Sequence, residues 1–283
     1  MIKFRSLFCL KKRKKILVIS WGWFKWVYAV WILKWLEELW LDKEIDAIFG
    51  VSIGAIIWSL WSYGLEADQI FKLLNNVSIN QFYTKNIFKK TWGLLSNEKF
   101  KDMLEKYLPN NFSSLNKNLY IWAVDANRAK FILFEKWDLP KIVLGSMAIP
   151  GIFPPVKYKN YNLVDGGVLN NFPVDLAKKL YPKSKIIWIA LQKFKKNQTI
   201  NTAINNLLVN FEIMLRTKVL ENTRFVDHLF YKEIPISILS LDKKKMTQVF
   251  DMWYQDCIKE FGKGLGTRKK NGKNEKGIKL KKG

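Results

Sequence analysis

The sequence is poor in the residues on which several classes of protein depend. Among its 283 residues there are two cysteines and one histidine. The cysteines, Cys9 and Cys257, are too few for a disulfide framework and fit no metal-ligand spacing. We therefore expect neither a disulfide-stapled secreted domain nor a Cys/His metal site, and the scarcity of cysteine is compatible with a reducing compartment.

Arginine is also scarce, although the formal net charge is +24. Only six of the 48 Lys and Arg residues are arginine, the side chain best suited to bidentate recognition of phosphates and base edges. We therefore expect no nucleic-acid partner. The opposite hypothesis, nucleic-acid binding, rests on charge alone and predicts DNA binding with a steep salt dependence. The lysine surplus has two other interpretations, attraction to anionic lipid surfaces and a genome-wide compositional bias.

No apolar run reaches the roughly 20 residues that a transmembrane helix needs. Residues 1–15 hold a short apolar patch followed by a basic run, the reverse of the order in a secretory signal. This segment is expected to be a disordered leader, with a peripheral membrane anchor as the alternative. Residues 262–283 are rich in Gly, Lys and Asn and are expected to be a disordered basic tail. A cytoplasmic or peripheral membrane location follows, and the oligomeric state stays open.

Hydrophobic periodicity predicts an α/β fold between these ends. Short apolar runs predict strands at 16–19, 47–51, 119–124, 131–134, 161–164 and 185–191. Helical spacing predicts helices at 27–41, 54–62, 142–148, 174–180, 201–225 and 246–261, and residues 65–118 are expected to be mostly helical. The alternation indicates a central, mostly parallel sheet flanked by helices. We expect residues 16–191 to form the catalytic core and residues 192–261 to form a helical part of the same domain.

One short motif indicates nucleophilic chemistry. A G-x-S-x-G pattern is formed by Gly50, Val51, Ser52, Ile53 and Gly54, between a predicted strand and a predicted helix. In that context the serine occupies a strained strand-to-helix turn, and the glycines remove side chains that would collide there. The helix N-terminus then favours negative charge developing near the hydroxyl. An ordinary glycine-rich turn is the alternative interpretation.

A nucleophilic serine needs a base, and two residues compete for that role. The single histidine, His228, lies far along the chain from any glycine-rich turn and is expected to be a surface or helix-end residue. Asp165 follows a predicted strand and precedes Gly166 and Gly167, so it should lie at a strand end, where α/β sheets place active sites. Desolvation would raise its pKa and make it a better base. Taken alone, however, Asp-Gly is common turn chemistry.

Besides the serine motif, the chain carries residues 148–155 (AIPGIFPP) and residues 164–173 (VDGGVLNNFP). These three motifs, in this order, resemble the patatin-like phospholipase family over about two thirds of the chain. The resemblance implies a three-layer α/β/α fold and a Ser52–Asp165 dyad without a catalytic histidine. It also implies release of fatty acid from phospholipid or related esters, with no metal or organic cofactor.

The family also has a glycine-rich oxyanion loop, G-G-G-x-[RK]-G, and here the sequence departs from it. The matching residues are Trp21, Gly22, Trp23, Phe24, Lys25 and Trp26. The spacing and Lys25, which could hold the loop or attract a lipid phosphate, agree with the family, but tryptophan replaces three of the four glycines. Tryptophan disfavours both positive φ and close approach of the backbone to an oxyanion.

The tryptophans permit two explanations. The chain has 13 Trp against 15 Gly, and several more stand where glycine would suit, namely Trp40, Trp58 and Trp137. We hypothesise that UGA encodes glycine at such positions, as it does in some bacterial lineages; UGG codons there would exclude this. The alternative is a catalytically impaired relative that binds anionic membrane surfaces. The leading prediction is a serine acyl-ester hydrolase acting on lipid.

Overall fold

The computed structural model describes residues 13–19, 26–76, 95–170, 172–190, 206–207, 209–210, 213 and 223–231. Its eight-stranded sheet has the order β5-β6-β3-β2-β1-β7-β8, and β4 also pairs with β3. The strands are β1 (Lys15–Ile19), β2 (Ala47–Gly50), β3 (Asn118–Asp125), β4 (Lys130–Phe134), β5 (Val156–Tyr158), β6 (Tyr161–Asp165), β7 (Lys185–Ala190) and β8 (His228–Tyr231). The contiguous strands β3, β2, β1, β7 and β8 run parallel, whereas β4, β5 and β6 pair in antiparallel fashion.

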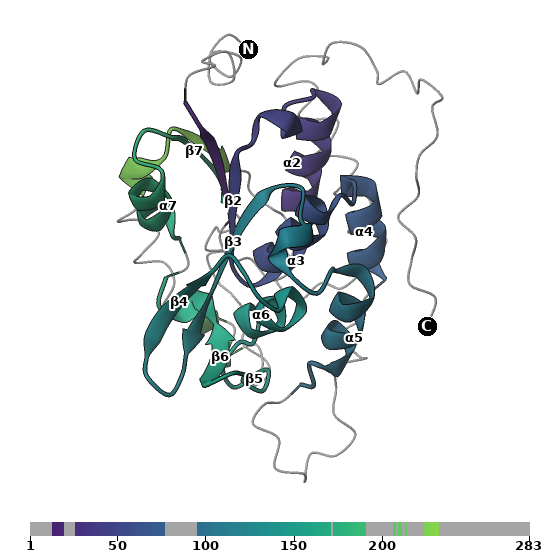
Figure 1. The fold of residues 1–283 in the computed structure, drawn as a ribbon, viewed down its shortest axis with the longest axis vertical. Coiled ribbons are helices and arrows are strands. Elements are labelled where there is room, and N and C mark those ends of the chain that lie inside the picture. Colours follow the sequence, from purple (N-terminus) through teal and green to yellow (C-terminus); the bar gives the residue numbers. More distant parts are fainter. Residues whose placement is uncertain are drawn as a thin grey trace.

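Helices cover both faces of the sheet. They are α2 (Trp26–Glu38), α3 (Ile53–Tyr63), α4 (Ala67–Asn75), α5 (Glu98–Tyr107), α6 (Leu139–Ser146) and α7 (Val174–Leu180). Figure 1 shows α2 to α6 on one side of the sheet and α7 on the other. The central strand β1 is buried along its whole length, because helices exclude water from both of its faces. The predicted α/β fold with a mostly parallel sheet flanked by helices is confirmed.

Several predicted boundaries differ from the observed ones. The helix expected at 142–148 begins at Leu139, because Asp138 caps it by accepting a hydrogen bond from the Lys141 N–H at 3.0 Å. Strand β5 was not predicted, since three residues are too few to show a period. The predicted helices at 201–225 and 246–261 lie mostly or wholly outside the described residues. In the part of the chain that is described, no helix is both long and apolar enough to cross a bilayer.

The ends of α2 and α3 share one backbone motif with different residues at its key position. At the end of α3, the N–H groups of Gly64 and Leu65 donate to the carbonyls of Trp61 and Leu60, both at 3.0 Å, and Gly64 has φ 116°. This is a Schellman motif, whose left-handed residue is usually glycine. At the end of α2, the Trp40 and Leu41 N–H groups make the equivalent bonds to Glu37 and Leu36 at 3.1 and 2.9 Å.

Trp40 therefore occupies the glycine position of this motif, with φ 60°. Trp137, in the turn before α6, has φ 80°. A left-handed conformation costs a non-glycine residue roughly 1–2 kcal/mol. Both side chains are substantially exposed, at 46% and 42%, so little burial offsets that strain. These two positions support the hypothesis that glycine is the encoded residue there.

We expect the variants Trp40→Gly and Trp137→Gly to unfold at the same temperature as the parent chain or higher. Release of left-handed strain should offset the loss of exposed contacts with lysine, such as that of Lys159 with Trp137. Trp122→Gly is the matched control: this indole is fully buried and donates to the Asn170 carbonyl at 2.8 Å, so its loss should cost about 3–5 kcal/mol. Thermal denaturation measures all three. A loss above about 1 kcal/mol at position 40 or 137 would contradict the interpretation.

Candidate active site

Ser52 lies at the sharp turn between β2 and α3. Its backbone has φ 56° and ψ −131°, outside the regions that L-residues ordinarily adopt. Such a conformation costs of order 1–3 kcal/mol and persists only where the surroundings enforce it. The side chain is fully buried, and the residue directly precedes the first residue of the helix, Ile53. This is the geometry of a nucleophile elbow.

The two glycines of the motif are required by close packing. A Cβ at Gly50 would lie 3.0 Å from the Gly54 carbonyl oxygen and 3.2 Å from Ala55 Cα, and a Cβ at Gly54 would overlap the side chain of Ile19. Any larger residue would push α3 away from β1 and β2 and release the turn that holds Ser52. The glycines thus fix the helix against the sheet directly behind the serine.

Asp165 is the last residue of β6 and is also fully buried. Its Oδ1 accepts a hydrogen bond from the Gly167 N–H at 2.8 Å, and its own N–H donates to the Ala148 carbonyl at 2.8 Å. A Cβ at Gly166 would lie 2.6 Å from the Trp122 carbonyl oxygen, so the turn after Asp165 needs a glycine to pass β3. Burial raises the pKa of Asp165 from 3.8 to about 7, against smaller lowering contributions from the Ser52 hydroxyl and the Gly167 N–H.

The sheet register brings Ser52 and Asp165 to the same level beside β3. Gly50 is the partner of Ile121, so Ser52, two residues later, comes level with Ala123. Ala123 in turn is the antiparallel partner of Asp165. Ser52 Oγ and Asp165 Oδ2 are buried without a hydrogen bond of standard length among the described residues. Ser52 nevertheless lies close enough to lower the pKa of Asp165, so the two side chains face each other without the geometry of a standard hydrogen bond.

His228 lies well away from Ser52. It is the first residue of β8, the edge strand of the sheet, and so does not end a helix. Its partner is Ile187, which is aligned through Leu17 with Ile48 of β2. Three strand spacings and four residues therefore separate it from Ser52, or roughly 14 Å across the sheet and 13 Å along it. The backbone of His228 therefore lies well outside contact distance of the Ser52 backbone.

The other predicted site residues are only partly described. Trp21, Gly22, Trp23, Phe24 and Lys25 lie outside the described residues. Trp26 begins α2, where it is buried with its ring centroid 5.7 Å from that of Phe71. Sequence reasoning missed one residue of the site, Ser146, whose hydroxyl is buried at the end of α6 in contact with the Ser52 N–H. Its only sequence signal is a serine two residues before the AIPGIFPP motif.

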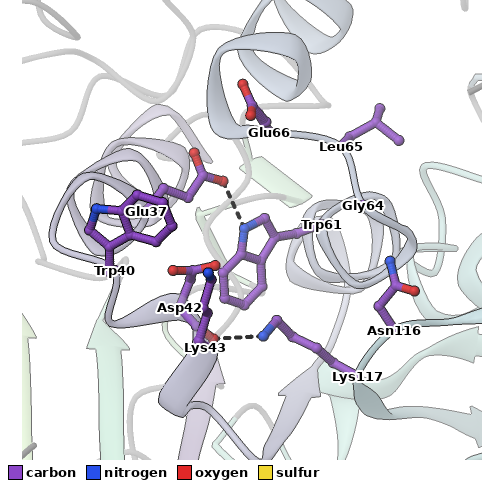
Figure 2. A pocket seen from close by; sticks show the side chains of 10 residues that line it. All are labelled: Glu37, Trp40, Asp42, Lys43, Trp61, Gly64, Leu65, Glu66, Asn116 and Lys117. Carbon is purple, nitrogen blue, oxygen red and sulfur yellow. Dashed lines mark hydrogen bonds between the residues drawn. The ribbon is translucent and has the colours of Figure 1, made fainter. Parts of the chain in front are cut away.

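The pocket drawn in Figure 2 lies at the amino ends of the parallel strands, whereas Ser52 lies at their carboxyl ends. Asp42 and Lys117, which line it, precede β2 and β3, whereas Ser52 follows β2. Glu37 accepts hydrogen bonds there from the Trp61 indole at 2.8 Å and from the first N–H of α4, and burial raises its pKa to about 7. These groups join α2, α3 and α4 and play no part at Ser52. In the described ranges, no three His, Cys, Asp or Glu side chains gather into a metal site.

Comparison with known proteins identifies the family of the chain. Residues 17–178, more than half of the chain, match the family described as patatin-like phospholipase. The chain belongs to the patatin-like phospholipase family. As a member of that family, it is a lipid acyl hydrolase.

Individual relatives of this patatin-like chain vary in similarity. A probable lipid hydrolase of Invertebrate iridescent virus 6 is 33% identical over 208 residues, covering 64% of this chain and 71% of the viral protein. A lysophospholipase of Candida albicans is 22% identical over 152 residues, covering 48% of this chain and 10% of the yeast protein. The crystal structure of VipD from Legionella pneumophila shares the fold, with a TM-score of 0.51 at 11% identity over 85% of this chain and 67% of VipD. The chain spans 61% to 71% of three viral relatives.

The buried carboxyl makes Asp165→Asn a stabilising substitution whose effect depends on pH. Because the folded-state pKa is raised, Asp165 favours folding when protonated, and that stability is lost as the pH rises from about 3.8 to about 7. The asparagine variant is neutral throughout. We expect its advantage in unfolding free energy to grow across this window to roughly 4 kcal/mol at most and to be level above it. Urea denaturation at pH 4, 5.5 and 8 measures the difference; a constant difference would contradict the raised pKa.

Proposed function

We propose that this chain hydrolyses acyl esters of lipids with Ser52 as the nucleophile and Asp165 as the general base. One observation carries the proposal: two buried side chains, a hydroxyl on a strained elbow and a carboxyl whose pKa is raised to about 7, flank the same strand. A carboxylate with an ordinary pKa near 4 is a poor base toward a serine hydroxyl. A pKa near 7 makes Asp165 a better proton acceptor at neutral pH, where much of it is still ionised.

In the acylation step, Ser52 Oγ attacks the ester carbonyl carbon while Asp165 accepts the hydroxyl proton. The tetrahedral intermediate collapses when the bond to the leaving alcohol breaks and that oxygen takes the proton from Asp165. Water then attacks the acyl-enzyme and gives a proton to Asp165. Breaking the Ser52–acyl bond releases the fatty acid, and the proton returns to Ser52.

The oxyanion of each intermediate needs backbone donors. The first N–H groups of a helix have no acceptor within that helix, and Ile53 is the first residue of α3. The Gly54 and Ala55 N–H groups donate to Val51 and Ser52 at 2.9 Å, so they are already engaged. The Ile53 N–H is therefore one proposed donor. Residues 21–26, at the position of the family's glycine-rich loop, are proposed to supply the others.

The proposed substrate is a phospholipid or a related lipid ester at an anionic membrane surface. The net charge of +24 supports attraction to such a surface, and the relatives named lipid hydrolase and lysophospholipase support the substrate class. The competing function is membrane binding without turnover, suggested by the tryptophans of the 21–26 loop. Assays of the chain beside a variant with glycine at positions 21, 23 and 26 separate the two functions.

Ser52→Ala should abolish hydrolysis of a fluorogenic acyl ester, lowering kcat by on the order of 10³-fold or more. The fold should persist, because alanine retains the backbone N–H of residue 52. Ser59→Ala is the control: Ser59 is a fully buried serine in α3, the helix that follows Ser52, and its hydroxyl donates to the Ala55 carbonyl at 2.7 Å, away from the site. Activity of Ser52→Ala clearly above background would show that another residue is the nucleophile.

The rate of acylation should follow the ionisation of Asp165. Only the carboxylate accepts a proton, so kcat/KM should rise about tenfold per pH unit in the acid range and level off above pH 7. Glu37 has a similar pKa but lies near the amino ends of the strands, away from Ser52. Glu37→Gln therefore serves as the control and should leave the pH dependence of kcat/KM unchanged. A profile that levels off near pH 4 would show that the base has an ordinary carboxyl pKa.

A further inference from the structure

Ser146 connects the elbow to the sheet through two hydrogen bonds. Its Oγ accepts a hydrogen bond from the Ser52 N–H at 3.1 Å and donates one to the Trp122 carbonyl at 2.7 Å. The side chain is fully buried at the last residue of α6. Trp122 immediately precedes Ala123, the partner of Asp165, so the hydroxyl joins the turn that carries Ser52 to the strand beside Asp165.

The residues around Ser146 hold the other half of the site. Two residues after it, the Ala148 carbonyl accepts the N–H of Asp165 at 2.8 Å. One residue before it, a Cβ at Gly145 would lie 2.7 Å from Leu163 Cβ, so glycine is needed for α6 to approach β6 this closely. The end of α6 therefore contacts the backbone of both Ser52 and Asp165, and a shift of this segment would change the separation of their side chains.

The bond to Ser146 also selects which N–H group is available for the oxyanion. Two successive N–H groups at the elbow, those of Ser52 and Ile53, lie outside the helical hydrogen-bond pattern. Ser146 occupies the first of them. The strained φ of 56° at Ser52 is stabilised in the same way, because a conformation of this kind persists only where neighbouring groups hold it.

We propose that Ser146 is a positioning residue for ester hydrolysis, which sets the orientation of Ser52 relative to Asp165 by holding the Ser52 backbone to β3. The proposal rests on the proposed function of Ser52 and adds a residue to it. Ser146 does not touch the substrate. Its loss therefore acts on the rate of acylation and not on substrate binding.

The variant Ser146→Ala should lower kcat for a p-nitrophenyl ester roughly ten- to hundredfold with KM unchanged, because small displacements of reacting groups cost this much. Labelling of Ser52 by a fluorophosphonate should slow by the same factor. Ser146→Thr keeps the hydroxyl and should restore most of the rate. Ser59→Ala, which removes a buried hydroxyl of the same kind from α3, should leave kcat and labelling within about twofold of the parent.

Three results would overturn the proposal. They are a Ser146→Ala variant that reacts at the parent rate, one whose loss of kcat is no larger than that of Ser59→Ala, and a threonine variant as slow as the alanine variant. If Ser146→Ala does not fold, Ser146→Cys, which is close in size but hydrogen-bonds weakly, should show the same selective loss of kcat. Failure of the proposed function is distinguishable, since it appears as activity retained in Ser52→Ala whatever residue 146 is.

Discussion

The proposed chemistry of this protein depends on keeping one carboxyl group out of water. Asp165 is fully buried, and desolvation raises its pKa to about 7. The same burial works against folding at neutral pH, because the ionised form has only one short hydrogen bond, from the Gly167 N–H. The second oxygen, Oδ2, has no hydrogen bond of standard geometry in the described part of the chain. The protein thus gives up stability at the place where the proposed mechanism needs a base, a trade-off known from active sites.

Backbone packing holds this costly arrangement in place. The glycines at 50, 54, 145 and 166 stand where a Cβ would collide with a neighbouring element, so α3, α6 and the turn after β6 all lie against the sheet at short range. Interiors at this density do not deform continuously. The strained elbow and the buried carboxyl are therefore enforced by close contacts in several elements, and no single hydrogen bond carries the whole site.

Much of this could be predicted from the sequence, because local patterns determine it. Apolar runs predicted four of the five parallel strands, β1, β2, β3 and β7, and the two glycine motifs located Ser52 and Asp165 at strand ends. What was missed depends on long-range pairing. Strand β8 was not predicted, because its pairing with β7 depends on the tertiary fold, and so His228 was not assigned to a strand. Nothing in the sequence around Ser146 shows that its side chain has a role at the site. Its hydrogen bonds join residues 94 and 24 positions apart in the chain and form only on folding.

The tryptophans connect the fold to the site. Two adjacent helices end in the same Schellman motif, one with Gly64 and the other with Trp40, and the shared hydrogen bonds show that the backbone requires a left-handed residue in both. A chain that used tryptophan there by selection should bury the ring to offset the strain, yet Trp40 is 46% exposed. The same reasoning applies to the loop at 21–26, where the family has glycine and an oxyanion must approach the backbone closely. The same replacement, glycine for tryptophan, would suit both the end of α2 and the proposed oxyanion loop.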